Sequence, residues 1–154
     1  MKMIKRIAVY ILLVLLLGAC DSQSKLSSVN YPDDKKIELI KSKIAAYSDI
    51  KWVEFSLYDV NNNEFLIPGA SNKDYKIVIS VDKEDIRKWL ENKQNLMTSV
   101  PISNEWISEV LPKEKYNELI KLPYTIYSDE KDGYNYTLFV NEEHGIILIR
   151  FIQI

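Results

Sequence analysis

The chain has 154 residues, with 20 Lys and Arg against 22 Asp and Glu, a formal net charge of −2 and one cysteine. This length is typical of a single domain with one hydrophobic core. One cysteine excludes an internal disulfide and any metal site built from several thiolates. Nucleic-acid-binding proteins cluster cations, so the slightly acidic balance predicts no nucleic-acid partner.

The first 20 residues have the layout of an export signal. Three cations lie within the first six residues, residues 7–17 are almost wholly apolar, and the small residues Gly18 and Ala19 precede Cys20. The apolar stretch is shorter than the roughly 20 residues that a transmembrane helix needs. We therefore expect a signal that is removed rather than a permanent span.

The segment Leu17-Gly18-Ala19-Cys20 resembles the lipobox of bacterial lipoproteins. The resemblance covers residues 1–20 only and implies that residues 1–19 are cut off and that the Cys20 thiol carries diacylglycerol. In many bacteria the new amine is acylated as well, and two or three chains give lasting attachment where one is marginal. The expected location is the cell membrane, lipid-anchored on its extracytoplasmic side, with no free thiol left for catalysis.

Asp21 follows the cysteine directly. In enterobacteria-like Gram-negative cells it resembles the signal that retains lipoproteins in the inner membrane, facing the periplasm; in a Gram-positive cell it is only the first residue of a polar tether. Residues 20–32 are expected to be the lipidated cysteine and a flexible, serine-rich tether, followed by one domain over residues 33–154. Removal of the leader takes away three cations and no anions, leaving a formal net charge of −5.

Helical spacing predicts an N-terminal helix and a middle helical block. The first helix begins at Asp33 and Asp34 and continues to about Ser48, with its apolar stripe ending at Tyr47. The middle block is expected over residues 82–93, 105–111 and 112–120. Of the tryptophans, Trp89 and Trp106 are assigned to the core, and Trp52 is expected on the more exposed side of a strand.

Alternating apolar residues predict strands from Ile50 to about Tyr58, at 65–67 and at 75–81, and a C-terminal three-stranded meander over residues 124–128, 134–140 and 146–152. Turns with positive φ are expected at Gly133 and Gly145. The last strand is apolar on nearly both faces and should be central. The predicted fold class is α+β: an antiparallel sheet of about five or six strands with the helical block on one face.

The sequence contains no complete metal-binding or cofactor-binding motif. Residues 59–63 begin like a calcium loop, but Glu64 stands where glycine is needed and Ala70 where the bidentate glutamate belongs. His144 is the only histidine, and its neighbours Glu142 and Glu143 point to opposite faces of a strand. A solvated turn is the simpler interpretation of His144, and we predict no metal and no cofactor.

No residue stands out as catalytic. A Ser–His–acid triad would need His144, and no nucleophile-elbow sequence accompanies it. Carboxylates are abundant, so a two-carboxylate hydrolase remains open, although nothing selects a pair. Asp129, Glu130 and Asp132 lie around a turn and are expected to be a solvated charge run.

Four tyrosines are the candidate partner-binding residues: Tyr124, Tyr127, Tyr134 and Tyr136. They crowd two consecutive strands, and tyrosine is enriched in binding patches because it joins a large apolar ring to a hydrogen-bonding tip. The alternative is that they pack beneath the helices or rim the sheet.

The expected function is therefore a membrane-anchored cell-envelope lipoprotein that presents a small, non-catalytic module for an unidentified protein partner. A particular form is an immunity or exclusion protein that neutralises a toxin or phage component, where an acidic surface would speed capture of a basic partner. A carboxylate-based envelope hydrolase and a purely structural lipoprotein are the alternatives.

Overall fold

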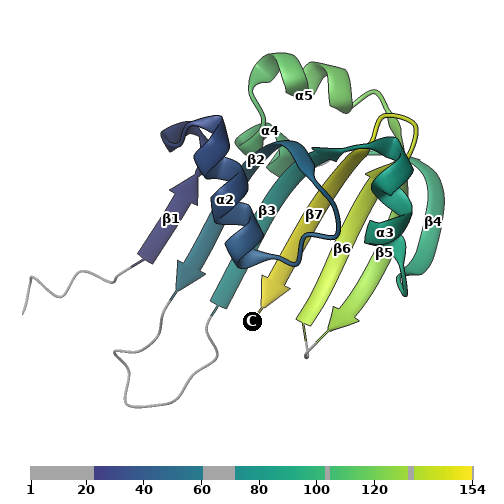
Figure 1. Ribbon diagram of the computed structural model, residues 1–154, viewed down its shortest axis with the longest axis horizontal. Helices are drawn as coiled ribbons and strands as arrows, with labels where there is room; N and C mark the ends of the chain where they lie inside the picture. Colours follow the sequence, from purple (N-terminus) through teal and green to yellow (C-terminus); the bar gives the residue numbers. More distant parts are fainter. Residues whose placement is uncertain (1–22, 61–71, 103–104, 132–133, 154) are drawn as a thin grey trace, which may run out of the picture.

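The computed structural model describes residues 23–60, 72–102, 105–131 and 134–153, which form an α+β fold around one antiparallel sheet (Figure 1). In this part of the chain the sheet has seven strands in the order β1-β2-β3-β7-β6-β5-β4. The strands are β1 (Gln23–Ser27), β2 (Ile50–Val60), β3 (Asn72–Val81), β4 (Gln94–Pro101), β5 (Pro123–Lys131), β6 (Tyr134–Asn141) and β7 (Ile146–Gln153). The helices are α2 (Asp33–Lys43), α3 (Ile86–Leu90), α4 (Glu105–Val110) and α5 (Lys113–Leu119), with 3₁₀ turns η1 (Ser28–Asn30) and η2 (Lys83–Asp85).

The segment expected to be a flexible tether instead forms β1 and η1 in its described part. Residues 23–27 pair with Val60 through Ser56 of β2, and Leu26 packs on the apolar core. The tether prediction was wrong here because strand pairing uses backbone groups, which a serine-rich segment supplies as well as any other. The long strand β2 has an edge whose backbone groups pair with this segment.

The second unexpected strand, β4, forms the opposite edge of the sheet. Its pairing with β5 shifts register on both sides of Met97, and Leu96 and Met97 are 51% and 57% exposed. An irregular edge strand has no buried face to impose alternation, so the sequence carries no period-two signal. The short strand expected at 65–67 and the turn at Gly133 lie outside the described residues.

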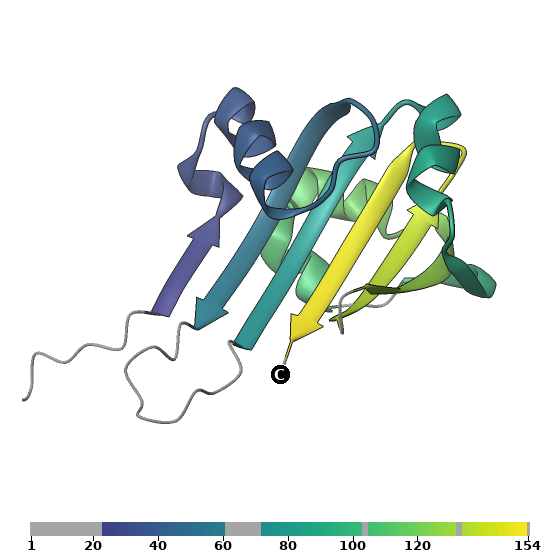
Figure 2. The ribbon, with the colours of Figure 1, turned by 60° about the horizontal axis from the view of Figure 1, so that its bottom comes forward.

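The meander is confirmed, and β7 lies at the centre of the sheet as its sequence predicted. Ile147, Ile149 and Phe151 face one apolar core, and Ile146 and Leu148 face the other. Both faces must therefore be covered. Figure 2 shows α2 and α3 over one face and α4 and α5 over the other.

The helical predictions hold in part. The expected single-sided middle block is wrong: α3 buries Ile86 and Trp89 in the core beneath α2, whereas α4 and α5 cover the opposite face. Trp89 and Trp106 are buried, as expected, and Trp52 is half-buried against the second core. The first helix ends at Lys43 rather than near Ser48, because Ile44 turns to an extended conformation.

Gly145 closes the β6–β7 turn with a φ of +66°, as its position predicted. A Cβ atom there would lie 2.3 Å from the carbonyl oxygen of Val81, and the Gly145 carbonyl accepts a 2.9 Å hydrogen bond from the Val81 amide. Glycine adopts this positive φ readily and, because it has no Cβ atom, allows the backbone of Val81 to come this close.

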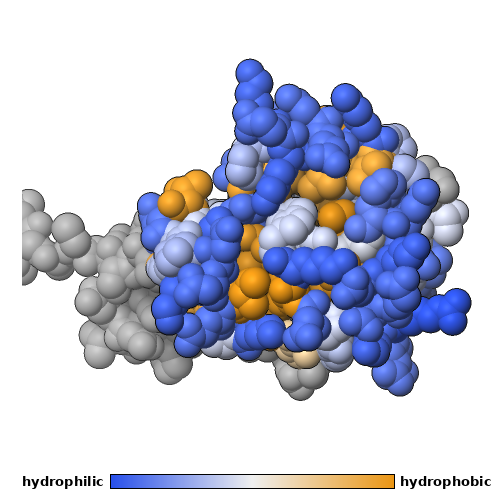
Figure 3. Space-filling view, turned by 45° about the horizontal axis from the view of Figure 1, so that its top comes forward, coloured by the Kyte–Doolittle hydropathy of each residue, from blue (hydrophilic) through white to orange (hydrophobic). Residues whose placement is uncertain are grey.

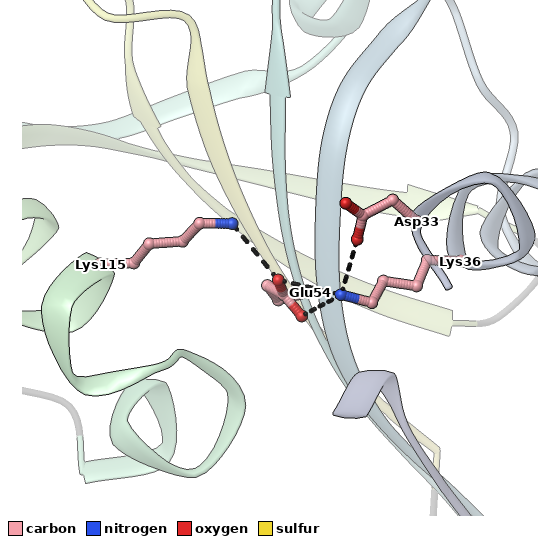
Figure 4. Close-up of polar contacts among 4 residues, drawn as sticks. All are labelled: Asp33, Lys36, Glu54 and Lys115. Carbon is pink, nitrogen blue, oxygen red and sulfur yellow. Dashed lines mark hydrogen bonds and ion pairs between the residues drawn. The ribbon is translucent and has the colours of Figure 1, made fainter. Parts of the chain in front are cut away.

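Glu54, a buried carboxylate 6% exposed, connects helices from the two faces of the sheet (Figure 4). Lys36 of α2 donates to both of its oxygens at 3.2 Å, and Lys115 of α5 donates at 3.3 Å. Lys36 also contacts Asp33 at 3.0 Å, and the Lys115 ammonium lies 4.1 Å from the Trp52 ring centre. Partial burial acts to lower the pKa of Lys36, but the hydrogen bonds and charges of Asp33 and Glu54 outweigh it and raise that pKa.

Replacing Glu54 with Gln should lower the free energy of unfolding by about 2 kcal/mol at neutral pH, because it weakens charge-assisted hydrogen bonds to a mostly buried ammonium. A folded-state pKa above the unfolded value means that Lys36 stabilises the fold fully below pH 10.5 and loses this contribution as pH rises through the folded value. The free energy of unfolding of the Glu54→Gln variant should therefore fall less at alkaline pH than that of the parent protein. Urea unfolding between neutral pH and pH 11 measures both effects, and Glu38→Gln, in an exposed pair with Lys35, is the control. Equal effects of the two substitutions would contradict the expectation.

Candidate functional site

A small pocket opens where residues 44–49 cross the sheet between α2 and α3. Its volume is about 160 Å³. Its lining combines aromatic, aliphatic and charged side chains: Lys43, Ile44, Ala45, Tyr47, Trp89, Lys93, Asp129, Tyr136, Leu138 and Ile149. We call it the aromatic pocket. The surface shown in Figure 3 is mostly hydrophilic, with hydrophobic side chains visible between the polar ones.

Tyr47 and Trp89 form the aromatic rim of the pocket. Their ring centres lie 5.3 Å apart in an edge-to-face arrangement, and the Trp89 indole donates a 2.8 Å hydrogen bond to the Ser48 hydroxyl. The Lys93 ammonium lies 5.3 Å from the Tyr47 ring centre. Tyr47 is 42% exposed, whereas Trp89 is buried, so Tyr47 is the more accessible of the two rings.

An ion pair between Lys93 and Asp129 lies in the pocket wall. The Nζ–Oδ2 distance is 2.7 Å, and the two side chains are only 7% and 22% exposed. Asn92, at a φ of +63°, turns the chain after α3 and brings Lys93 back over the sheet; asparagine tolerates this left-handed conformation better than most residues. The pair fixes a positive and a negative group in a largely apolar wall.

Tyr136 joins the pocket to a row of aromatic rings on the sheet, in which Tyr136 stacks on Phe151 and Phe151 is tilted against Tyr75. The Tyr136 ring lies 4.8 Å from that of Phe151, which lies 5.4 Å from that of Tyr75. The Tyr75 hydroxyl donates a 2.8 Å hydrogen bond to Asp59. Burial and then this hydrogen bond raise the pKa of Tyr75 well above its usual range, so the phenol stays protonated. Of these three rings, Tyr136 lines the pocket.

A wider groove of about 570 Å³ lies on the other side of the 44–49 segment and shares Ile44, Ala45 and Tyr47 with the pocket. Its two acids are each paired with a lysine: Asp49 with Lys41 at 3.8 Å, and Asp85 with Lys88 at 2.7 Å. Ala46 lines only this outer groove, whereas Ala45 lines both spaces.

The size of the aromatic pocket limits what it can hold. A cavity of about 150 Å³ accepts a molecule as large as benzene, whereas pockets for drug-sized ligands are about 300–1,000 Å³. Asp129 is the one carboxylate in the lining, and Lys93 holds it. The arrangement suits one apolar or aromatic side chain with a polar tip better than two-carboxylate chemistry.

The structure separates the candidate tyrosines whose side chains it describes. Tyr124 is buried on the α4–α5 face, where its hydroxyl donates to the Leu119 carbonyl at 2.9 Å and burial raises its pKa. Tyr127 and Tyr136 pack against the core beneath α2, and Tyr127 donates to Glu142 at 3.4 Å. The side chain of Tyr134 lies outside the described part of the structure. Tyr124 therefore lies on the opposite face of the sheet from Tyr127 and Tyr136, and of these three Tyr136 lines the pocket.

Asp129, expected in a solvated charge run, is instead half-buried within β5 and paired. The sequence also placed Tyr47 on a helical core stripe, although it follows the helix and stands at the pocket rim. The role of Lys93 was missed altogether. A lysine beyond a short helix gives no signal of its carboxylate partner 36 residues away.

The remaining candidates that the structure describes contact neighbouring side chains of the fold. Asp59 is held by Tyr75 and by Lys43 at 3.9 Å, and residues 61–70 of the rejected calcium loop lie outside the described part. His144 is exposed in the β6–β7 turn, 2.9 Å from the Asn141 side chain. No group of three or more His, Cys, Asp or Glu side chains able to hold a metal occurs where the structure is described.

Cys20 and Asp21 also lie outside the described residues, so their roles stay predictions. In the part that is described, every helix is too short or too polar to cross a membrane. No family model, curated protein or solved structure shows a significant match to the chain.

Replacing Asp129 with Asn should lower the free energy of unfolding by about 2 kcal/mol, because the nearly buried Lys93 ammonium loses its anionic acceptor. The tryptophan emission of the folded protein should change, because Lys93 contacts Tyr47 and Tyr47 contacts Trp89. Urea denaturation and emission spectra measure these effects. The matched control is Asp82→Asn, which breaks an exposed pair with Lys51 and should cost less than about 1 kcal/mol.

Proposed function

We propose that this protein is a lipid-anchored binding module of the cell envelope and that its aromatic pocket receives one side chain of a protein partner. The observation that carries the proposal is the pocket itself, which joins an exposed tyrosine, a buried tryptophan and a fixed ion pair in a space of single-side-chain size. Tyrosine and tryptophan are the residues that most often dominate binding energy at protein interfaces.

The surroundings of the pocket support a protein partner over a free small molecule. The pocket shares the lining residues Ile44, Ala45 and Tyr47 with the wider, more polar groove. An interface of this kind has a buried anchor surrounded by a polar rim. The partner's anchor would enter the pocket, and its flanking residues would meet the lysines and aspartates of the groove.

The lipid anchor is supported by the lipobox-like Leu17-Gly18-Ala19-Cys20 and by the apolar run before it. Replacing Cys20 with Ser should abolish incorporation of labelled palmitate and release the protein from the membrane fraction, because acyl chains on the Cys20 sulfur provide the attachment. A parent protein without palmitate, or a variant that stays on the membrane, would contradict the proposed anchor.

Filling the pocket tests the binding proposal. With a photoreactive phenylalanine analogue in place of Tyr47, illumination of intact cells should crosslink one partner. Adding Ala45→Trp should reduce this crosslink at least about tenfold, the equivalent of about 1.4 kcal/mol of lost affinity.

Ala46→Trp is the matched control, because Ala46 is the next residue and lines only the outer groove. It should preserve most of the crosslink. Equal losses from both substitutions would show that the partner does not use the aromatic pocket, and circular dichroism of both variants checks that they fold.

A further inference from the structure

The position of β1 limits how far the domain can lie from Cys20. Gln23 is the first residue of β1, so only Asp21 and Ser22 lie between it and the cysteine. Three residues span at most about 11 Å when fully extended. The 12-residue tether that the sequence suggested would have allowed a mean reach of about 20 Å.

The strand register shows which part of the sheet shares this end. Gln23 pairs with Val60, Val60 with Asn72, and Lys73 with Gln153. We call this the Gln23 end; it is the lower end of the sheet in Figure 1, where the C-terminus also lies. The opposite end carries the β6–β7 turn with Glu143 and Gly145.

We propose that the Gln23 end of the sheet lies against the headgroup layer of the membrane that holds Cys20 and keeps the aromatic pocket close to that membrane. This inference rests on the proposed lipid anchor. The chain leaves β1 at this end, so a short connection draws this end, and not the β6–β7 turn, toward the lipid.

The strand register also gives the position of the aromatic pocket relative to Gln23. One row of paired residues crosses the sheet from the edge strand to the pocket: Leu26, Leu57, Tyr75, Phe151, Tyr136 and Asp129. Leu26 lies three residues from Gln23, about 10 Å along the strand, and Tyr136 lies four strands away from it, about 19 Å across the sheet. Tyr136 is therefore about 22 Å from Gln23 and no more than about 33 Å from the Cys20 Cα atom in any tilt of the domain.

The charges of the Gln23 end suit an anionic headgroup layer. Asp59 and Asp74 each face a cation of the fold, Lys43 at 3.9 Å and Arg150 at 3.7 Å. Lys73 forms no salt bridge within the described ranges, whereas the exposed Lys25 lies close enough to Glu109 to help lower the pKa of that carboxyl. A lysine near an anionic leaflet is attracted to the negative surface of that leaflet. Lys73 would meet the headgroups.

A spin label at each end of the sheet tests the orientation. Because the Cys20 sulfur is acylated in the mature lipoprotein, Lys25→Cys or Glu143→Cys supplies the single free thiol for a nitroxide. In vesicles of phosphatidylethanolamine and phosphatidylglycerol that contain a nickel-chelating lipid, we expect several-fold greater relaxation enhancement at position 25 than at position 143. Both side chains are exposed, so neither label should disturb the core.

The matched control inserts 12 Gly and Ser residues between Ser22 and Gln23, which should reduce the enhancement at position 25 while leaving acylation unchanged. Mass spectrometry of each sample reports whether Cys20 is acylated. If Cys20 is acylated, three results would each overturn the orientation alone. These are equal enhancement at both labels, greater enhancement at position 143, or no enhancement at either label. An unacylated Cys20 would overturn the proposed anchor and this inference together.

Discussion

The burial of β7 on both faces is the constraint on which the rest of the structure depends. This strand is central in the described sheet, and its apolar side chains alternate between two cores. A sheet with water on one side would expose half of them, at a cost of about 25 cal/mol per Å². The chain therefore needs helices on both faces, and the short elements α3, α4 and α5 are stabilised by this burial rather than by their own helix propensity.

Glu54 gives this layered arrangement a polar connection at one edge. A buried carboxylate is costly unless its oxygens are satisfied, and Lys36 and Lys115 satisfy them from helices on opposite faces of the sheet. The geometry restricts where α2 and α5 can sit relative to β2. Hydrophobic burial supplies the main stabilisation, and the charged cluster makes the placement of the two helices specific.

The aromatic pocket follows from incomplete cover on one face. The chain leaves α2 at Lys43, so residues 44–49 cross the sheet as a bent, non-helical segment and not as another helical turn. The segment covers the core less fully than a helix would, and the gap is lined by Tyr47, Trp89 and Tyr136. Lys93 and Asp129 hold each other in the pocket wall, so in the proposed binding role a partner would have little of this wall to order.

The sequence alone determined the α+β class, the C-terminal meander, the central position of β7, the positive φ of Gly145 and the burial of Trp89 and Trp106, because each follows from local periodicity or the conformational needs of one residue. Only the tertiary structure decided that residues 23–27 form β1, that α3 and α4 cover opposite faces, and that Lys93 meets Asp129. Those outcomes depend on backbone pairing and on contacts between residues far apart in the chain. Neither leaves a repeating pattern in the sequence.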